Sequence, residues 1–186
     1  MDTQTARLNF LKVAFRDYKV GAWSPSSKYL VKRVLRYVPR DLSLVMEFGP
    51  GGGVMTQALL SHLAPQGKLI VVEPNPDFVA MLSKIPDTRV RVVRGTAESF
   101  MKDYRAHGGA QADVMLSSIP FSFLKPRERE SFVVAAQTHL RTGGMFIVFH
   151  QYVPLAKKVL EKVFGKTVVA YEWRNFLPCF VFIARK

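Results

Sequence analysis

Cysteine is almost absent from this 186-residue sequence, in which Cys179 is the single example. One cysteine cannot form an internal disulfide, and it cannot supply the set of thiolates that holds a structural zinc ion. We therefore interpret Cys179 as a structural residue and expect no bound metal. The composition suits a reducing compartment, and we expect the protein in the cytoplasm.

Long apolar runs are also missing. The sequence has no run of the roughly 18 or more apolar residues that a bilayer-spanning helix needs, and its apolar runs are short, as over 145–149. Charged side chains interrupt the apolar ones throughout residues 1–20, so these do not resemble the apolar stretch of a secretory signal. We expect neither a membrane-spanning protein nor a secreted one.

Acidic residues are scarce, with 14 Asp and Glu against 27 Lys and Arg and a net charge of +13. A positive field of this size attracts either nucleic acid or the anionic leaflet of a membrane. The alternative is that the charge only keeps the protein soluble. The charge therefore narrows the choice of partner and leaves the reaction open.

Short apolar runs alternate with amphipathic helical patterns from Leu44 onward, as in βα units around a largely parallel sheet. The expected strands cover 44–48, 68–73, 89–94, 113–117, 145–151, 167–173 and 179–185, and the expected helices cover 54–63, 76–83, 126–139 and 154–164. A turn is expected over 142–144, and the short link over 174–178 predicts an antiparallel hairpin of the last two strands. We predict one α/β domain over 1–186 with a seven-stranded, mostly parallel sheet.

A basic amphipathic helix is predicted within residues 1–20. Apolar side chains recur there at helical spacing among cationic ones, as Leu8, Leu11, Phe15 and Tyr18 among Arg7, Lys12, Arg16 and Lys19. Such a helix either lies in a bilayer interface or caps the core with its basic face in water. Trp23, just beyond it, favours the interface, because indole prefers the boundary between apolar and wet surroundings.

Glycines follow the first expected strand, at Gly49, Gly51, Gly52 and Gly53. Such a turn lets the backbone approach a nucleotide-like ligand, although a structural tight turn has the same pattern. Glu73 ends the next strand, where a carboxylate can accept both ribose hydroxyls. Residues 95–98 follow the third strand and can border an adenine. Three strand ends thus converge on one ligand.

These motifs resemble those of class I methyltransferases, which use S-adenosylmethionine. The matching residues are Glu47 with Gly49, Gly51 and Gly53, and Glu73 as the second acidic position. Glu47 distinguishes the pattern from that of a dehydrogenase. The resemblance implies a Rossmann-like core over 42–186 and conversion of S-adenosylmethionine to S-adenosylhomocysteine.

The resemblance also implies roles for single residues. Glu47 is expected near the ammonium group of the cofactor, and further cofactor contacts are expected from Pro74, Thr96, Ala97 and Ser117. Thr96 departs from the family, which usually has Asp there to contact the adenine amino group. That contact is then left to Glu98 or to a backbone carbonyl.

The fourth expected strand ends in the segment 117–121, Ser-Ser-Ile-Pro-Phe, which is similar to the family's acceptor motif. Enzymes that dimethylate ribosomal RNA adenine have Asn or Asp where this sequence has Ser118, followed by an aromatic residue as at Phe121. They also continue into a helical RNA-binding domain, whereas this sequence ends after its last expected strand. Their pattern is therefore matched only in part.

A closer resemblance is to bacterial phospholipid and ornithine lipid N-methyltransferases. It covers nearly the whole sequence, through the segments 20–22, 25–27 and 120–124, and through Arg174 and Asn175 with Pro178. It implies a peripheral enzyme at the inner face of the cytoplasmic membrane that methylates the amine of phosphatidylethanolamine towards phosphatidylcholine. An anionic lipid surface is then the expected partner, nucleic acid is not, and we expect a monomer.

This reading assigns the remaining site residues. The expected catalytic residues are Ser117, Ser118 and Tyr152, and the expected substrate contacts are Tyr18, Ser118, Pro120, Phe121, Tyr152, Arg174 and Asn175. Arg174 suits a lipid phosphate because its guanidinium is a planar donor. Ordinary packing is the alternative for Tyr152, and core packing or lipid insertion for Phe121 and Phe123. An ornithine lipid, an RNA adenine and a small amine remain alternative acceptors.

Overall fold

The computed structural model describes residues 26–106, 109–151, 155–175 and 177–186. The predicted helix within 1–20, Tyr18 and Tyr152 lie outside the described residues. None of the helices in the described part of the chain has the length and apolar composition needed to cross a bilayer.

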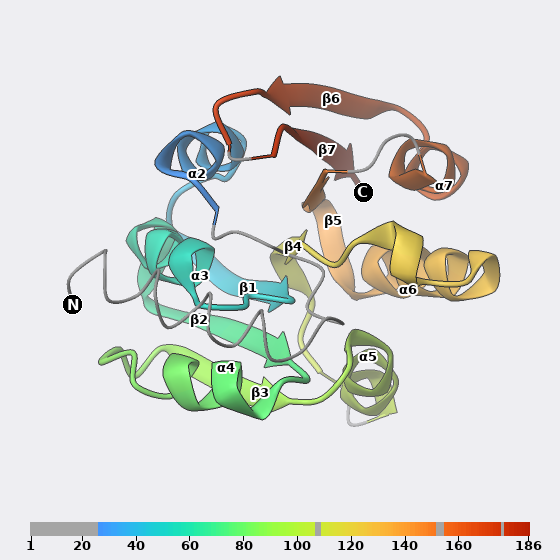
Figure 1. The fold of residues 1–186 in the computed structure, drawn as a ribbon. Helices are drawn as coiled ribbons and strands as arrows, with labels where there is room; N and C mark the ends of the chain where they lie inside the picture. Colours follow the sequence, from blue (N-terminus) through green and yellow to red (C-terminus); the bar gives the residue numbers. More distant parts are fainter. Residues whose placement is uncertain (1–25, 107–108, 152–154, 176) are drawn as a thin grey trace.

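Seven strands form one sheet in the order β3-β2-β1-β4-β5-β7-β6 (Figure 1). Their bounds are β1 Leu42–Phe48, β2 Leu63–Glu73, β3 Val90–Arg94, β4 Ala112–Ser117, β5 Leu140–His150, β6 Thr167–Glu172 and β7 Cys179–Arg185. The first five strands pair in parallel, and β7 is antiparallel to both β5 and β6. This topology confirms the predicted α/β class, the largely parallel sheet and the terminal hairpin.

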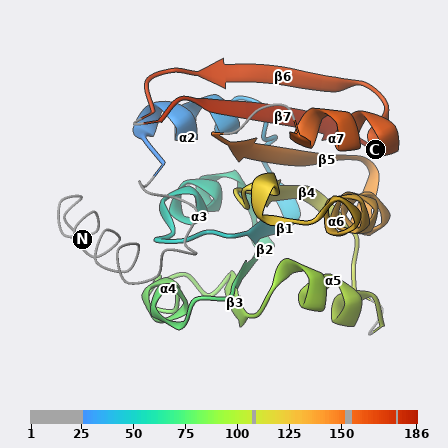
Figure 2. The same ribbon diagram turned by 45° about the vertical axis from the view of Figure 1, so that its right-hand side comes forward.

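Helices cover both faces of the sheet (Figures 1 and 2). They are α2 Lys28–Leu35, α3 Val54–Leu59, α4 Pro76–Leu82, α5 Ala97–Ala106, α6 Pro126–His139 and α7 Leu155–Phe164, with the 3₁₀ turns η1 Leu60–His62 and η2 Phe121–Phe123. Strand side chains alternate between the faces, so Val45 packs with α2 and α3, whereas Met46 packs with α5, α6 and α7. The sheet therefore separates two apolar layers.

Several expected boundaries were wrong, and one helix was not expected. The helix expected over 54–63 is α3 followed by η1, and Leu63 already begins β2 opposite Leu42. The turn expected over 142–144 lies inside β5, at an irregularity of its pairing with β4 where Gly143 has φ +76°. Helix α5 was not expected, because among its described side chains only Phe100 and Met101 are buried and its apolar stripe is narrow.

Parallel pairing brings the carboxyl ends of β1, β2, β3 and β4 to one edge of the sheet. The glycine-rich turn leaves β1 at this edge, and the segment 117–121 leaves β4 beside it. Open α/β sheets bind their ligands at such an edge, where neighbouring connections diverge. The fold thus brings the predicted motifs together.

Candidate functional site

The glycine-rich turn requires glycine for conformational reasons. Gly49, Gly51 and Gly53 have φ of +73°, +54° and +79°, a region that residues with a side chain rarely adopt. A Cβ atom on Gly53 would lie 2.9 Å from Leu82 Cδ2, so the turn also packs closely against α4. The turn is anchored to the sheet, because the Gly49 N–H donates to the Val72 carbonyl over 3.1 Å.

Glu73 ends β2 directly behind this turn. Its side chain is buried, and its Oε2 accepts the Gly51 N–H over 3.2 Å while its Oε1 accepts the Asn75 N–H over 3.0 Å. Burial raises the pKa of Glu73, and these two hydrogen bonds oppose the rise. A carboxylate has about four lone-pair positions, so the two backbone bonds leave it able to accept ligand hydroxyls.

Glu47 is the second buried carboxylate of the site. It lies in β1, and its Oε2 accepts the Thr56 hydroxyl of α3 over 2.7 Å. Burial raises the pKa of Glu47 to about 7; the Thr56 hydrogen bond lowers it and the nearby charge of Glu73 raises it further. A buried carboxyl that is half protonated near neutral pH becomes fully ionised when a cation approaches it. Glu47 therefore suits a positively charged ligand group.

The expected acceptor motif lies directly against the glycine-rich turn. The Ser118 N–H donates to the Phe48 carbonyl over 3.1 Å, and the Ser118 hydroxyl donates to the Gly49 carbonyl. Ser117 is fully buried, and its Oγ accepts the Ile119 N–H over 3.3 Å. The structure therefore places Ser117 and Ser118 beside the turn. Because the Ser118 hydroxyl donates its hydrogen bond to the Gly49 carbonyl, its oxygen still has lone pairs that can accept a hydrogen bond from another donor.

The other predicted cofactor contacts lie on the rim of the site. Pro74 and Thr96 are exposed, and Ala97 is half-buried at the start of α5. The Thr96 hydroxyl accepts the Ser99 N–H over 3.2 Å and thereby caps α5. Thr96 thus has a structural role in helix capping where the family usually has an acidic side chain.

Phe121 lies in the core, one of the two alternatives considered for it. Its side chain is fully buried and packs on the rings of His150 and Phe132, with centroids 5.7 and 6.3 Å away. Phe123 is 58% exposed, whereas Pro120 is half-buried beside the site. Of the two phenylalanines in this segment, only Phe123 offers its ring to an external partner.

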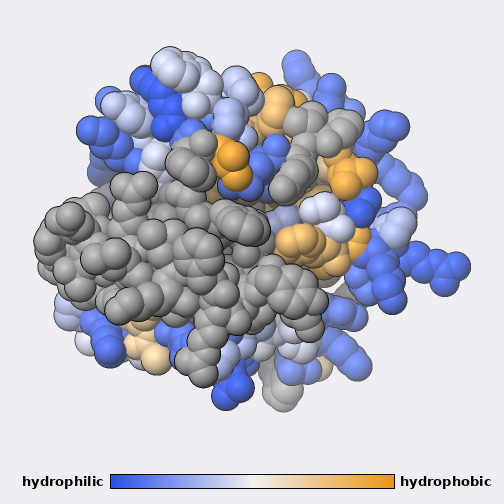
Figure 3. All heavy atoms as spheres, in the orientation of Figure 1, coloured by the Kyte–Doolittle hydropathy of each residue, from blue (hydrophilic) through white to orange (hydrophobic). Residues whose placement is uncertain are grey.

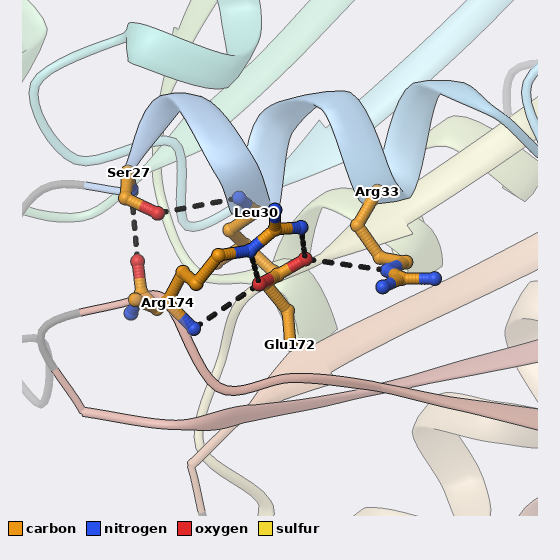
Figure 4. A network of polar contacts seen from close by, with 6 residues as sticks. Ser27, Leu30, Arg33, Glu172 and Arg174 are labelled. Carbon is orange, nitrogen blue, oxygen red and sulfur yellow. Dashed lines mark hydrogen bonds and ion pairs between the residues drawn. The ribbon is translucent and has the colours of Figure 1, made fainter.

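Arg174 belongs to a polar network between α2 and β6 (Figure 4). Its Nε and Nη2 donate to the Glu172 carboxylate over 2.8 and 2.9 Å, and Arg33 Nε approaches the same carboxylate from α2 over 3.3 Å. The Glu172 side chain is fully buried, and the hydrogen bond from Arg174 is the main cause that lowers its pKa to about 2. Arg174 therefore uses two of its nitrogen atoms inside the protein.

Asn175 fastens the turn between β6 and β7. Its Oδ1 accepts the Ser27 N–H at the start of α2 over 2.8 Å. Its Nδ2 donates to the Leu177 carbonyl over 2.9 Å and to Cys179 Sγ over 3.3 Å. The buried amide thus has internal partners, and in this structure Asn175 holds the turn against α2.

Three residues of these networks were not among the predicted site residues. Asn75 precedes Pro76 and caps α4, and an Asn-Pro pair at a helix start was the available signal for it. Glu172 is the single charged residue of β6, where a lone carboxylate indicates an ion pair. Thr56 had no local signal, because its contact with Glu47 depends on the path of the turn.

Comparisons with known proteins agree with this geometry. Residues 24–177 match the family described as the methyltransferase small domain. The chain is 27% identical over 170 residues to ornithine lipid N-methyltransferase of Singulisphaera acidiphila, covering 89% of this chain and 88% of that protein. It is 33% identical over 126 residues to mitochondrial dimethyladenosine transferase 2 of Bos taurus, covering 63% of this chain but 31% of that protein.

Solved structures share the fold. Fibrillarin of Aeropyrum pernix, in complex with natively bound S-adenosyl-L-methionine, superposes with a TM-score of 0.59 at 18% identity, covering 79% of this chain and 67% of that one. The site residues fit the same cofactor. Glu73 retains lone pairs for ribose hydroxyls, Glu47 suits a cationic group, and the turn lets a ligand approach its backbone closely.

Proposed function

The chain belongs to the methyltransferase small domain family and is an S-adenosylmethionine-dependent methyltransferase, and on this premise we propose that it methylates the amine of a membrane lipid headgroup. The similarity to ornithine lipid N-methyltransferase carries the proposal, because it extends over 89% of this chain and 88% of that protein. The site is proposed to act at the inner face of the cytoplasmic membrane. Phosphatidylethanolamine and ornithine lipid are the two candidate acceptors.

The cofactor would be held by the residues of the strand ends. Glu73 would accept the ribose hydroxyls, Glu47 would lie near the ammonium group, and Thr96 and Ala97 would border the adenine. When bound, S-adenosylmethionine supplies an electrophilic methyl group on a sulfonium sulfur. The pKa of Glu47 is about 7, so the positive charge of the ammonium group would be enough to shift this carboxyl to its ionised form at neutral pH.

The chain's own contribution to the reaction is to position an unprotonated amine and to exclude water. The Ser118 oxygen, whose proton is directed to Gly49, is proposed to accept an N–H of the amine and so to direct the nitrogen lone pair at the methyl group. Ser117 supports this geometry through its hydrogen bond to the Ile119 N–H. The proton that the amine loses after transfer leaves to water.

The decisive experiment offers one lipid amine at a time. The protein is incubated with methyl-labelled S-adenosylmethionine and vesicles of phosphatidylglycerol that contain phosphatidylethanolamine, its monomethyl derivative or ornithine lipid, and the lipids are then resolved. We expect label in one acceptor series. Glu73→Ala should abolish labelling, whereas Asp77→Asn, an exposed acid nearby, should not. The absence of labelled lipid in all three would overturn the proposal.

Methylation of RNA is the second candidate. The similarity to dimethyladenosine transferase 2 favours it, as does the net charge of +13, which suits a phosphate backbone. The chain covers 31% of that protein, so we place this candidate second. Ribosomal RNA in the same labelling assay provides the test, and label in RNA without label in lipid would reverse the order.

A further inference from the structure

We propose that the side of the sheet formed by the carboxyl ends of β4, β5 and β6 docks on the surface of a bilayer that contains anionic lipid. The contact consists of five exposed apolar side chains, which we call the apolar rim: Tyr29, Phe123, Leu155, Trp173 and Leu177. The inference rests on the proposed function and adds a membrane contact that is separate from the predicted helix within 1–20.

Topology places the apolar rim along one edge. Strands β4, β5 and β6 point the same way, and β7 runs against β5 and β6. Phe123 follows β4, Leu155 begins α7 after β5, and Trp173 and Leu177 lie in the connection between β6 and β7. Helix α7, which begins at Leu155, packs against η2, which ends at Phe123.

Tyr29 extends the rim to α2. The Arg174 guanidinium lies over its ring at 4.5 Å from the centroid and also approaches the Trp173 ring, at 5.8 Å. The rim therefore continues from α2 to η2 along the edge at which Ser117 and Ser118 leave β4. A surface docked through this rim would present its headgroups beside the candidate site.

The most exposed members of the rim are Trp173, at 68%, and Phe123, at 58%. Hydrogen bonds hold the two residues after Trp173, because the Arg174 N–H donates to Glu172 over 3.1 Å and Asn175 Oδ1 accepts the Ser27 N–H. Large apolar side chains that gather on one surface mark an interaction site, and indole favours the membrane interface. These hydrogen bonds hold the backbone next to Trp173 in place, while its side chain is exposed to a partner.

Lysine side chains lie close to the apolar rim, and their positive charges favour an anionic surface. Lys28 Nζ lies 5.3 Å from the Tyr29 ring centroid, Lys125 is two residues from Phe123, and Lys158 is one helical turn from Leu155. Figure 3 shows the molecule in the orientation of Figure 1, with apolar side chains among strongly hydrophilic ones on the upper part of the visible face. Each cation near an anionic leaflet adds to binding. An apolar rim flanked by cations fits such a leaflet.

The first test measures binding to vesicles of phosphatidylcholine with and without phosphatidylglycerol. The double variant Phe123→Ser/Trp173→Ser should bind the anionic vesicles at least about tenfold more weakly than wild type, because two apolar insertions are lost. The matched control is Val134→Ser/Val168→Ser, which removes exposed apolar side chains from α6 and from the amino end of β6. Equal binding of both variants would overturn the proposal.

A second measurement locates the contact. The sequence has two tryptophans, so Trp23→Phe leaves Trp173 as the single tryptophan, which can be excited selectively over tyrosine. Its emission should shift to the blue on anionic vesicles and be quenched by lipids with brominated acyl chains. Vesicle-bound protein whose Trp173 remains unquenched would contradict insertion, whatever the binding strength.

Two further readouts separate this inference from the proposed function. Methyl transfer to a dispersed short-chain lipid should persist in the double variant, while transfer to vesicle lipid falls. If the variant methylates vesicle lipid like wild type, the rim is not the contact, although the proposed function stands. If rim variants lose binding to RNA and keep binding to vesicles, the surface serves nucleic acid and the inference is overturned.

Discussion

Glu47 shows how one buried residue links folding to ligand chemistry. Among the described residues its side chain has no cationic partner; it accepts the Thr56 hydroxyl and is affected by the charge of Glu73. Burial therefore favours its protonated form, and its pKa rises from 4.5 to about 7. A bound ammonium group would reverse this preference, so ligand binding and ionisation of Glu47 are coupled.

The stability of the cofactor-free protein should accordingly depend on pH. The folded-state pKa of Glu47 lies above its unfolded value, so the stabilisation is present below about pH 4.5 and is lost as pH rises through about 7. The raised pKa corresponds to about 3 kcal/mol of unfolding free energy. Urea unfolding at about pH 5 and about pH 8 measures the fall.

Glu47→Gln should reduce this fall and leave the smaller part that Glu73, whose pKa is also raised, contributes in the same direction. Glu98→Gln, at an exposed position, provides the control and should keep the wild-type dependence. If the unfolding free energy of Glu47→Gln fell with rising pH as much as that of wild type, Glu47 would not be the group that causes the pH dependence.

Gly53 provides a second prediction at this scale, because Gly165 has the same φ of +79° and nothing within 4 Å of its Cβ position. Gly165→Ala should cost about 1–2 kcal/mol of stability through backbone strain alone. Gly53→Ala adds a contact with Leu82 and should cost at least about 1 kcal/mol more. Calorimetry should also show weaker S-adenosylmethionine binding for Gly53→Ala only; equal behaviour of both variants would contradict the packing argument.

At this scale the sequence predicts the carboxylates and the glycines, because their spacing from strand ends is visible without a structure. Thr56, which donates to Glu47, comes from α3, and its contact depends on the path of the glycine-rich turn. Asn75, whose N–H donates to Glu73, is only two residues away from that carboxylate and was marked by its Asn-Pro pair. The expected phosphate contact of Arg174 remains a prediction. What the sequence does not reveal is that this arginine also holds Glu172.

An ion-pair network joins helix α2 to the end of strand β6. Glu172 is fully buried between Arg33 and Arg174, and the hydrogen bond from Arg174 lowers its pKa to about 2. Glu172→Gln should lower the melting temperature by more than about 4 °C at neutral pH, because two arginines lose their counter-charge. Glu130→Gln removes an exposed ion pair with Lys162 and should have little effect.

The same pair of variants carries a pH signature. The folded-state pKa of Glu172 is below 4.5, so its stabilisation is present above about pH 4.5 and is lost as pH falls towards about 2. The difference in melting temperature between wild type and Glu172→Gln should therefore shrink at about pH 3. A difference that stayed constant with pH would indicate packing and not charge as its source.

Elements were predictable where local chemistry marks their ends. The bounds of α6 and β7 were correct to the residue, because Pro126 begins the helix and Pro178 precedes the strand. Helix α5 was missed because few of its side chains are buried, and the start of β5 was misplaced because a glycine pair inside a strand looks like a turn. In both cases tertiary packing decides what local pattern leaves open.

For the whole molecule, the net charge of +13 predicts salt-dependent docking. Binding to phosphatidylglycerol-containing vesicles should fall at least about tenfold between about 0.1 M and about 1 M NaCl, since the screening length falls from about 10 Å to about 3 Å. Phe123→Ser/Trp173→Ser should show a similar proportional fall from a lower starting value. If vesicle binding did not change with the NaCl concentration, the net charge would not contribute to docking.

Strand β7 has a consequence for the order of events during synthesis. It comes after β1 to β6 in the sequence, yet it lies between β5 and β6 in the sheet and pairs with both. Until β7 has left the ribosome, β6 has no neighbouring strand, and the outer side of β5 stays open. Nascent chains therefore expose unpaired strand edges until residues 179–185 have been synthesised, which is the interval in which a holding chaperone would matter most.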